Sequence, residues 1–483
     1  MPDAMLGLPH VQIRPQLSWR EDRFLGMTSA LTVLGVGESS VTETAGGPPP
    51  VALRRNKGFR MLWIGQLLSD TGSEAGLLAY PLLILALTHS AVLAGVVGTA
   101  RAITLICLQL PAGALADRFD RRLTMIACDT VRAVLLATLG ILIVVDLASW
   151  PVVLVVSLVE GSAGALFSPA AAAALPQIVA SGQLEEAWAA TEGRTWGAGL
   201  AGPALGGALY GLGQAVPFLA DALSYAASFG TVSRIRGRFR PQQPTRRKAL
   251  RHEVADGLKL VWRVPLLRAV VIQAPLINFA FNGMLFTITL AMRQHGTSSA
   301  VIGLVQAGIM AGGVLGAIGA PRLQRRIRLR TMCVASSAAG AVLFGAAALL
   351  IPSPLVAVPV ALDILLAPAV NAMLFAVMLR SAPEEMRGRV TNTVTMAAMA
   401  LAALAPLVAG VLVEHASGTW AAGAFAGTMT LAAGISLVLP GLRDVDSRGG
   451  EQGRETAPRF SGRLTGRGGG RWPPRRSRRR CRA

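Results

Sequence analysis

Apolar residues in this chain are gathered in long blocks, separated by short polar or basic segments. Each block runs for about twenty residues, the length that a helix needs to cross roughly 30 Å of hydrocarbon. The blocks predict twelve transmembrane helices, near residues 61–87, 91–113, 123–145, 151–172, 191–212, 215–233, 269–291, 299–320, 331–351, 354–379, 390–413 and 418–440. We therefore expect an all-α polytopic membrane protein.

Basic residues alternate between the turns that join these blocks. Arginines and lysines precede the first block and follow the second, sixth, eighth and tenth, whereas the intervening short turns hold almost none. This alternation follows the positive-inside rule, so we expect both termini in the cytoplasm and the spans in the inner, or cytoplasmic, cell membrane. The turn around Ser181–Glu186 departs from the pattern because it is acidic.

The longest polar interval divides the spans six and six. The chain is thus predicted to comprise a disordered cytoplasmic leader at 1–55, an N-terminal six-helix half at 56–233, a cytoplasmic central loop at 234–268, a C-terminal six-helix half at 269–442 and a basic disordered cytoplasmic tail at 443–483. The central loop includes an amphipathic stretch, Arg251–Trp262, which we expect on the inner membrane surface. Met1 and Met27 are both candidate start residues.

Composition narrows the function classes. Only 15% of the residues are charged and 52% are hydrophobic, which argues against a water-soluble enzyme. The net charge of +20 belongs largely to the tail and the alternate turns, so we expect membrane lipid as a partner and no nucleic acid. Five histidines near span ends, no CxxC spacing and no Walker A sequence leave no catalytic site, metal site or cofactor to expect.

The turn between the second and third spans carries a first motif. It includes Gly113, Asp117, Arg118, Arg121 and Arg122 and resembles the loop-2/3 signature of the major facilitator superfamily, G-x-L-a-D-r-x-g-r-[kr]. Asp120 stands where the pattern has its second glycine, and a weaker echo recurs at 316–326. The resemblance implies a conformational gate, in which the acid and the arginines lock against helix ends in one state. Arginines that only set topology are the alternative.

A second motif lies in the fifth span. Gly202, Pro203, Gly206 and Gly207 resemble the G-x3-G-P-x2-G-G element of exporters in this superfamily, with Ala198 in place of the first glycine. The resemblance implies a pivot between closely packed helices, and ordinary small-residue packing is the alternative.

Four shorter segments extend the resemblance over most of the chain. These are Phe167–Pro169, Asp221–Tyr225, Val254–Trp262 and Pro383–Val390. Together they are similar to the third drug:proton antiporter branch, which includes macrolide efflux proteins and the enterobactin exporter. That resemblance implies the major facilitator fold, two pseudo-symmetric halves that alternate access, and a proton gradient as energy source.

The implied function is efflux, with multidrug resistance as its expected consequence. The substrate would be an amphipathic small molecule such as a drug, a macrolide-like antibiotic, a siderophore or another secondary metabolite, and its identity stays open. Two alternatives on the same scaffold are a lipid or lysolipid facilitator or flippase, and a membrane scaffold that transports nothing. We expect a monomer.

Ionisable residues inside the spans are candidates for proton coupling, because a charge in hydrocarbon is costly and faces a cavity or a partner. Glu74 and Arg101 lie at similar distances in sequence from the turn near Thr88, so we expect them to pair at one depth. Separation of that pair during transport would let Glu74 take up a proton. A purely structural ion pair is the alternative, and Asp70 is a second candidate carrier.

The remaining polar residues within spans are assigned by their spacing. Asp129 and Arg132 are one helical turn apart, and we expect them to satisfy each other. Candidates for the substrate cavity all lie in the C-terminal half, where polar residues are sparse: Asn278, Asn282, Asp363 and Asn371. Interhelical hydrogen bonds are the alternative for the asparagines.

Overall fold

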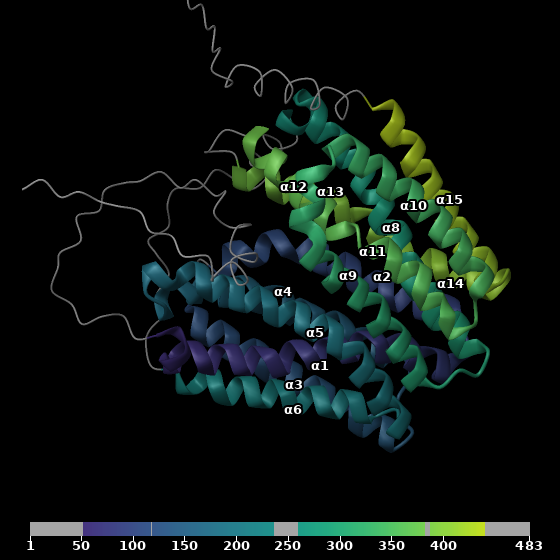
Figure 1. Cartoon of the computed structure of the whole chain (residues 1–483). Helices are drawn as coiled ribbons and strands as arrows, with labels where there is room; N and C mark the ends of the chain where they lie inside the picture. Colours follow the sequence, from purple (N-terminus) through teal and green to yellow (C-terminus); the bar gives the residue numbers. More distant parts are fainter. Residues whose placement is uncertain (1–51, 117, 236–258, 382–386, 440–483) are drawn as a thin grey trace, which may run out of the picture.

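The computed structural model describes residues 52–116, 118–235, 259–381 and 387–439, which form a bundle of long helices (Figure 1). The first six are α1 (Lys57–Thr88), α2 (Ala91–Ala116), α3 (Arg121–Val144), α4 (Trp150–Ile178), α5 (Leu184–Leu212) and α6 (Val216–Arg234). The others are α8 (Pro265–Gln294), α9 (Ser299–Arg326), α10 (Leu329–Leu350), α11 (Ala357–Ile364), α12 (Ala367–Ser381), α13 (Arg387–Ala400), α14 (Ala405–His415) and α15 (Gly418–Val438). Short 3₁₀ turns are η1 (Leu53–Arg55), η2 (Ser181–Gln183), η3 (Pro354–Val356) and η5 (Ala402–Leu404).

Each predicted span coincides with one helix or a pair of helices in these residues. Ten of the described segments are long and apolar enough to cross a membrane. The two others are α5 and α6. Both are less apolar, since α6 includes Asp221 and several hydroxyl residues, and α5 includes Glu185, Glu186 and Glu192.

The prediction was wrong about the acidic turn before the fifth span. Helix α5 begins at Leu184 rather than near residue 191, so Glu185 and Glu186 lie in its first turn. Acidic side chains are favoured there because the N-terminal end of a helix carries a partial positive charge. Their acidity therefore marks the start of a helix.

Two spans that were predicted as single helices are interrupted. The tenth changes from α11 to α12 at Leu365–Leu366, and the eleventh from α13 to α14 through η5. Pro368 and Pro406 stand near the start of the second helix in each case. Proline fits the first turn of a helix because its missing N–H has no partner to bond there. Each interruption therefore starts a new helix rather than kinking an old one.

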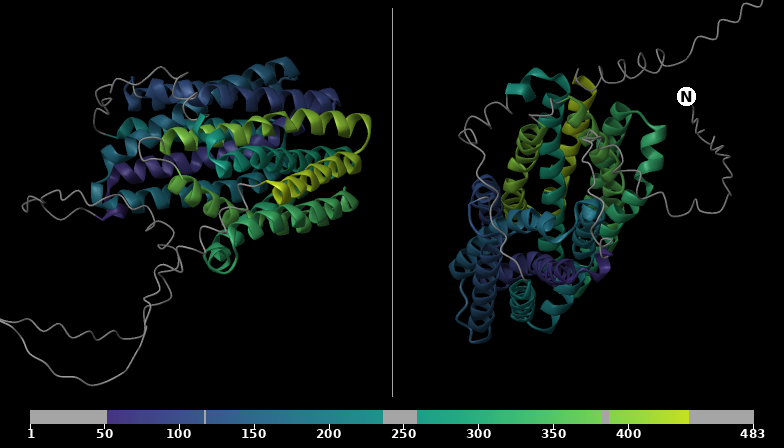
Figure 2. Two further views of the ribbon diagram at one scale, coloured as in Figure 1. Left: turned by 90° about the horizontal axis from the view of Figure 1, so that it is seen from above. Right: turned by 90° about the vertical axis from the view of Figure 1, so that its left-hand side faces the viewer.

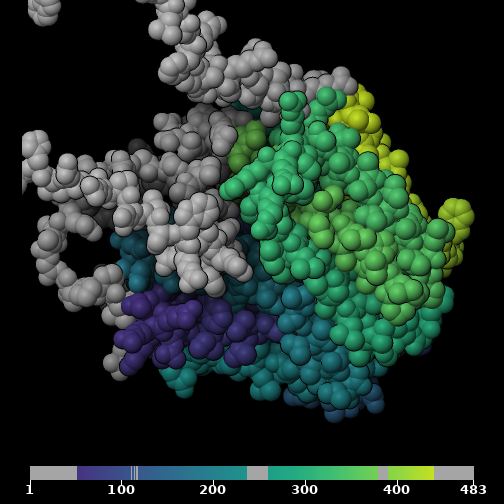
Figure 3. Space-filling view, in the orientation of Figure 1, coloured from purple at the N-terminus to yellow at the C-terminus, as the bar shows by residue number. Residues whose placement is uncertain are grey.

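Helices α1 to α6 pack together as one half and α8 to α15 as the other (Figure 2). In the space-filling view the two halves form adjoining masses, purple to blue-green and green to yellow (Figure 3). Arginine-rich turns precede α1 and join α2 to α3 and α9 to α10, and we call the end of the bundle that carries them the basic end. The halves diverge toward this end (Figure 1).

Two seams join the halves near the opposite end. Helix α2 packs on α14, where Gly95 lies against the backbone of Pro406 and Leu407. Helix α5 packs on α9, where Gly207 and Gly303 face each other. The second helix of each half thus meets the fifth helix of the other, as pseudo-twofold symmetry requires.

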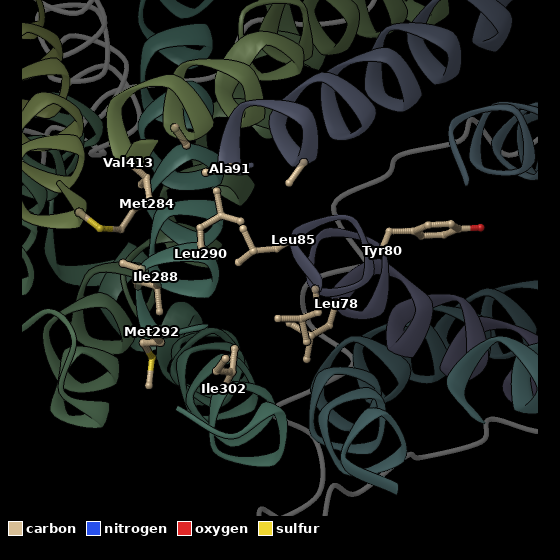
Figure 4. Packing of buried hydrophobic residues seen from close by; sticks show 14 of the residues in the cluster. Leu78, Tyr80, Leu85, Ala91, Met284, Ile288, Leu290, Met292, Ile302 and Val413 are labelled. Carbon is tan, nitrogen blue, oxygen red and sulfur yellow. The ribbon is translucent and has the colours of Figure 1, made fainter. Parts of the chain in front are cut away.

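A continuous apolar core lies between the seams. Leu85 and Ala91 from the first half belong to one buried cluster with Met284, Leu290 and Val413 from the second (Figure 4). Small side chains at the seams let the backbones approach closely, which is the usual basis of helix association in membranes. The structure is therefore tightly closed at the end away from the basic turns.

Candidate functional site

A buried carboxylate holds the first half together. Glu160 in α4 is almost fully buried, and its Oε2 lies 2.8 Å from Arg101 Nη2 in α2. Its Oε1 lies 3.5 Å from Arg132 Nη2 in α3 and accepts a hydrogen bond of 3.1 Å from the Tyr225 hydroxyl in α6. Tyr225 is hydrogen-bonded in turn to Ser73 of α1 at 2.7 Å. This network, which we call the Glu160 cluster, joins five helices.

Aromatic rings add to the cluster. The guanidinium carbon of Arg132 lies 4.4 Å from the centre of the Tyr225 ring, and that of Arg101 lies 5.7 Å from the centre of the Tyr80 ring. A cation over an aromatic face is attracted by the negative charge density of that face. Both arginines are therefore held by one carboxylate and by rings that exclude water.

The predicted pair of Glu74 with Arg101 is wrong. Arg101 binds Glu160, and its side chain lies against Gly161 of the same helix α4. Glu74 makes no ion pair with Arg101 within 4 Å, and its Cβ packs on Gly202 of α5. Counting residues from the turn gives depth in the membrane, but the direction of a side chain depends on helix rotation. The expected pair of Asp129 and Arg132 fails for the same reason, since Asp129 accepts a 2.7 Å hydrogen bond from Ser228 of α6.

Glu74 lies on the face of α1 that is directed toward the second half. Asp70 is one turn nearer the basic end, and Leu77 and Pro81 continue the same face at helical spacing. Leu77 and Pro81 line a cavity of about 190 Å³ that is closed by Phe286 and Pro406 of the other half. The described residues provide no ion pair to Glu74, which is half-buried. It is therefore an acid without a cation partner beside a junction between the halves.

Asp70, the second predicted carrier, is paired. Its Oδ2 lies 3.1 Å from Nε of Arg194 in α5, and the same guanidinium donates to Gln66 of α1. The Asp70 side chain is 34% exposed, whereas that of Arg194 is 7% exposed. The charge of the buried arginine is thus matched by an acid that solvent can reach.

The four residues of the exporter element lie where three helices meet. Gly202 and Gly206 receive Glu74 and Ala75 of α1, while Gly207 lies on Ser299 and Gly303 of α9. The carbonyl oxygen of Pro203 also packs on Gly303. A side chain at Gly206 or Gly207 would meet backbone atoms of the neighbouring helix. The element therefore places α5 in contact with both halves, and its role as a pivot remains a prediction.

The described arginines of the gate motif contact their own half. Arg121 donates to the carbonyl oxygen of Ala173 in α4 at 2.8 Å, and Arg122 donates to the last carbonyls of α6 at Val232 and Ser233. A cation at the end of a helix satisfies unpaired carbonyls and the negative end of the dipole. Arg118 is exposed and Gly113 has no close neighbour. Asp117 lies outside the described residues.

Asp120, which departs from the motif pattern, has its own structural role. Its Oδ1 accepts hydrogen bonds from the backbone N–H groups of Arg122 and Leu123, at 2.9 and 3.2 Å. It is thus the N-cap of α3, a position that favours aspartate over most residues. An aspartate directly before an apolar block is a signal that sequence reasoning had available and did not use.

The substrate-cavity candidates of the second half do not converge on one point. Asn278 and Asn282 stand two turns and one turn before Phe286 on the same face of α8, and each amide donates to the carbonyl four residues earlier at 2.9 Å. Asp363, half-buried, lies over Gly340 of α10. Asn371 is exposed in α12, beyond the helix break. The asparagines on α8 therefore face the first half, and a substrate role for all four remains a prediction.

Sequence reasoning missed a carboxylate at the α2/α14 seam. Oε2 of Glu414, near the end of α14, accepts hydrogen bonds from the Ser90 hydroxyl and the Val92 backbone N–H, both at 2.7 Å. The Thr99 hydroxyl accepts another from the Leu407 N–H at 3.0 Å. Glu414 thus caps the first turn of α2 from the opposite half. No periodicity could pair two positions more than three hundred residues apart.

Residues 62–397 match the family model of the Major Facilitator Superfamily. The chain belongs to this superfamily. It is accordingly a multi-pass membrane transporter, and its helical architecture is the one expected from the motifs. The described residues of this superfamily member contain no group of three His, Cys, Asp or Glu side chains able to hold a metal ion.

Two of the proteins that this chain resembles are multidrug efflux pumps, and both are called Tap. The chain is 25% identical over 398 residues to the multidrug efflux pump Tap of Mycolicibacterium fortuitum, which covers 80% of this chain and 96% of the relative. It is 26% identical over 419 residues to the multidrug efflux pump Tap of Mycobacterium tuberculosis, covering 81% and 95%.

Solved structures share the fold at low sequence identity. The nucleoside transporter NupG superposes with a TM-score of 0.66 at 13% identity, over 79% of this chain and 99% of that one. A bacterial homologue of the iron transporter ferroportin in an inward-facing state gives 0.63 at 14% identity, over 80% and 98%. These likenesses show the major facilitator fold.

We predict that replacing the central carboxylate of the Glu160 cluster destabilises the transporter. Glu160→Gln leaves Arg101 and Arg132 buried without their shared counter-charge, and breaking such a pair costs about 3–5 kcal/mol. The free energy of unfolding in mixed micelles, measured by titration with a denaturing detergent, should fall by that order. Glu186→Gln, at an exposed position of α5, is the control. Equal stability of both variants would contradict a structural role for Glu160.

We predict that removing the Glu414 cap loosens the α2/α14 seam. Glu414→Ala withdraws an anion from a helix N-terminus, an interaction that corresponds to a roughly two- to fivefold change in an equilibrium. Spin labels at exposed Leu212 and Trp420, on opposite halves, would report the change as a larger population at long distance.

The label experiment uses a protein whose four native cysteines are replaced. Glu185→Ala removes an exposed acid at the basic end and should leave the distance distribution unchanged. A distribution in Glu414→Ala that matches the unsubstituted protein would show that the seam does not depend on this carboxylate.

Proposed function

We propose that this transporter exports an amphipathic small molecule across the cytoplasmic membrane in exchange for protons, with Glu74 as the proton-carrying acid. The observation that carries the proposal is the position of Glu74: unpaired among the described residues, on the face of α1 directed toward the second half, and packed on Gly202 of the exporter element. The surroundings of a carboxylate at this position change when the cavity opens and when α5 moves.

The coupling step follows from solvation. When the space between the halves is open to water, the ionised form of Glu74 is hydrated. When the halves close around it, burial disfavours the charged form, and Arg101 offsets this only in part, since Arg101 contacts Glu160 directly and Arg194 contacts Asp70. A proton taken up before closure would therefore accompany the change of state.

The direction of transport is supported by two independent features. The exporter element contacts both α1 and α9, as a pivot between the halves would. The curated relatives named above are efflux pumps. With the basic end in the cytoplasm, as the positive-inside rule requires, the seams described here close the outer side. The structure then corresponds to a state open to the cytoplasm, from which an exporter collects its substrate.

The substrate would bind between the halves. The first half presents charged groups on this side, and the second presents the amides of Asn278 and Asn282. A mostly apolar space with few polar groups is typical of sites for amphipathic ligands. Asp363 and Asn371 lie further toward the helix break of the second half and are proposed as its outer part.

We predict that Glu74→Gln abolishes drug-driven proton movement. Everted membrane vesicles that contain the transporter would be energised to an acidic interior and then given erythromycin or norfloxacin, with a pH-sensitive dye as the readout. The unsubstituted protein should release protons on addition of a transported drug, and Glu74→Gln should not, because a glutamine takes up no proton. Exchange of drug down its own gradient should persist.

The matched control is Glu192→Gln, which neutralises an exposed acid on α5. It should release protons as the unsubstituted protein does. Full coupling in Glu74→Gln would rule out Glu74 as the carrier, and absence of proton release in the unsubstituted protein with both drugs would rule out the proposed exchange for them.

A further inference from the structure

We infer that a cavity between α1, α4 and α5 binds a one- or two-ring aromatic group of the exported molecule. The inference rests on the proposed function and adds a subsite to it, in the first half and apart from the asparagines of α8. The cavity measures about 180 Å³ and lies toward the basic end of the three helices.

Aromatic side chains from all three helices line this cavity. Trp63 of α1, Phe167 of α4 and Trp188 of α5 are among its lining residues. Trp63 is fixed by a 3.0 Å hydrogen bond from its Nε1 to the carbonyl oxygen of Ala190 in α5. Aromatic rings pack against one another in offset or edge-to-face arrangements. The hydrogen bond of Trp63 therefore holds one of the walls against which a ligand ring can pack.

The size of the cavity limits what it can hold. An apolar cavity of about 150 Å³ accommodates benzene, whereas pockets for whole drug-sized molecules measure about 300–1,000 Å³. The cavity is thus large enough for one ring or two fused rings but not for an entire macrolide. Alanines of α4, including Ala172, provide the room, because a larger side chain at that position would project into it.

A charged pair forms one side of the same cavity. Asp70 and Arg194, 3.1 Å apart, both line it together with Gln66. The pair has no net charge and offers both an acceptor and donors, so it suits a ring that carries a zwitterionic or uncharged hydrogen-bonding substituent. Because the Asp70 side chain is 34% exposed and Trp188 is 41% exposed, a ligand can reach this edge without unfolding the site.

The position of the subsite indicates the stage of transport at which it would bind the substrate. It lies at the basic end, where the halves diverge, and in the proposed orientation this is the side from which substrate arrives. Arg194 links the subsite to α1 through Asp70, one turn from Glu74. An aromatic substrate would therefore bind beside the helix face that carries the proposed proton acceptor.

The test compares an aromatic ligand with one that has no aromatic ring. Norfloxacin is a zwitterion with a fused two-ring quinolone core, and erythromycin is a macrolide without aromatic rings. Binding of each to the purified full-length protein would be measured by titration calorimetry. Ala172→Phe fills the cavity, and Trp188→Ala removes one of its walls.

Norfloxacin should bind the unsubstituted protein, and both variants should weaken that binding by roughly two- to tenfold, the effect of losing an aromatic contact. Erythromycin should be unaffected. Ala173→Phe, one residue along the same helix and not part of the cavity lining, is the matched control and should bind both compounds normally.

The inference is overturned if norfloxacin does not bind, if neither variant weakens its binding, or if Ala173→Phe weakens it equally. Failure of the proposed function has a different signature: norfloxacin binds, but neither drug releases protons from vesicles of the unsubstituted protein.

Discussion

Two largely buried arginines share one carboxylate, and the arrangement of the helices in the first half depends on this interaction. Arg101 and Arg132 come from different helices, and their side chains are only 13% and 10% exposed, so most of their charge must be matched inside the bundle. Glu160 does this from a third helix, and Tyr225 and Ser73 extend the arrangement to two more. The relative rotation of these helices is therefore set by electrostatics as well as by packing, and it fixes which face of α1 is left to carry Asp70 and Glu74.

The second half is organised differently. Its helices approach through glycines, as where Gly312 and Gly316 of α9 receive the backbone of α11 and of Leu365 at the helix break. Polar contacts inside it are neutral, such as the Gln306 amide donating to Thr289 at 2.7 Å and the Gln273 amide donating to Ser337 at 3.0 Å. Among the described residues, the ion pairs thus lie in the first half, and the second half has neutral hydrogen bonds. The proposed proton acceptor, Glu74, belongs to the half that holds these ion pairs.

The spans, the family and the motifs could be predicted from the sequence because they depend on local properties. Hydropathy defines a span without reference to its neighbours, and the alternation of arginines is visible in the chain itself. The partners of Arg101 and Glu74 could not be predicted, because sequence spacing fixes the depth of a residue and not the rotation of its helix. Glu414 was invisible for a related reason, since its partners belong to the other half and its own segment shows nothing unusual.

The two seams differ in how they can come apart. Between α5 and α9, in the part of the chain that is described, glycine backbones touch and no side-chain hydrogen bond crosses. The two helices can therefore shift against each other at little energetic cost, because no side-chain hydrogen bond has to break. Between α2 and α14, Glu414 and Thr99 accept hydrogen bonds from specific N–H and O–H groups. These bonds are either formed or broken, so this seam has two distinct states. Opening of the end that carries these seams would then be unequal: the α5/α9 contact could move gradually, whereas the α2/α14 contact would first have to lose its hydrogen bonds.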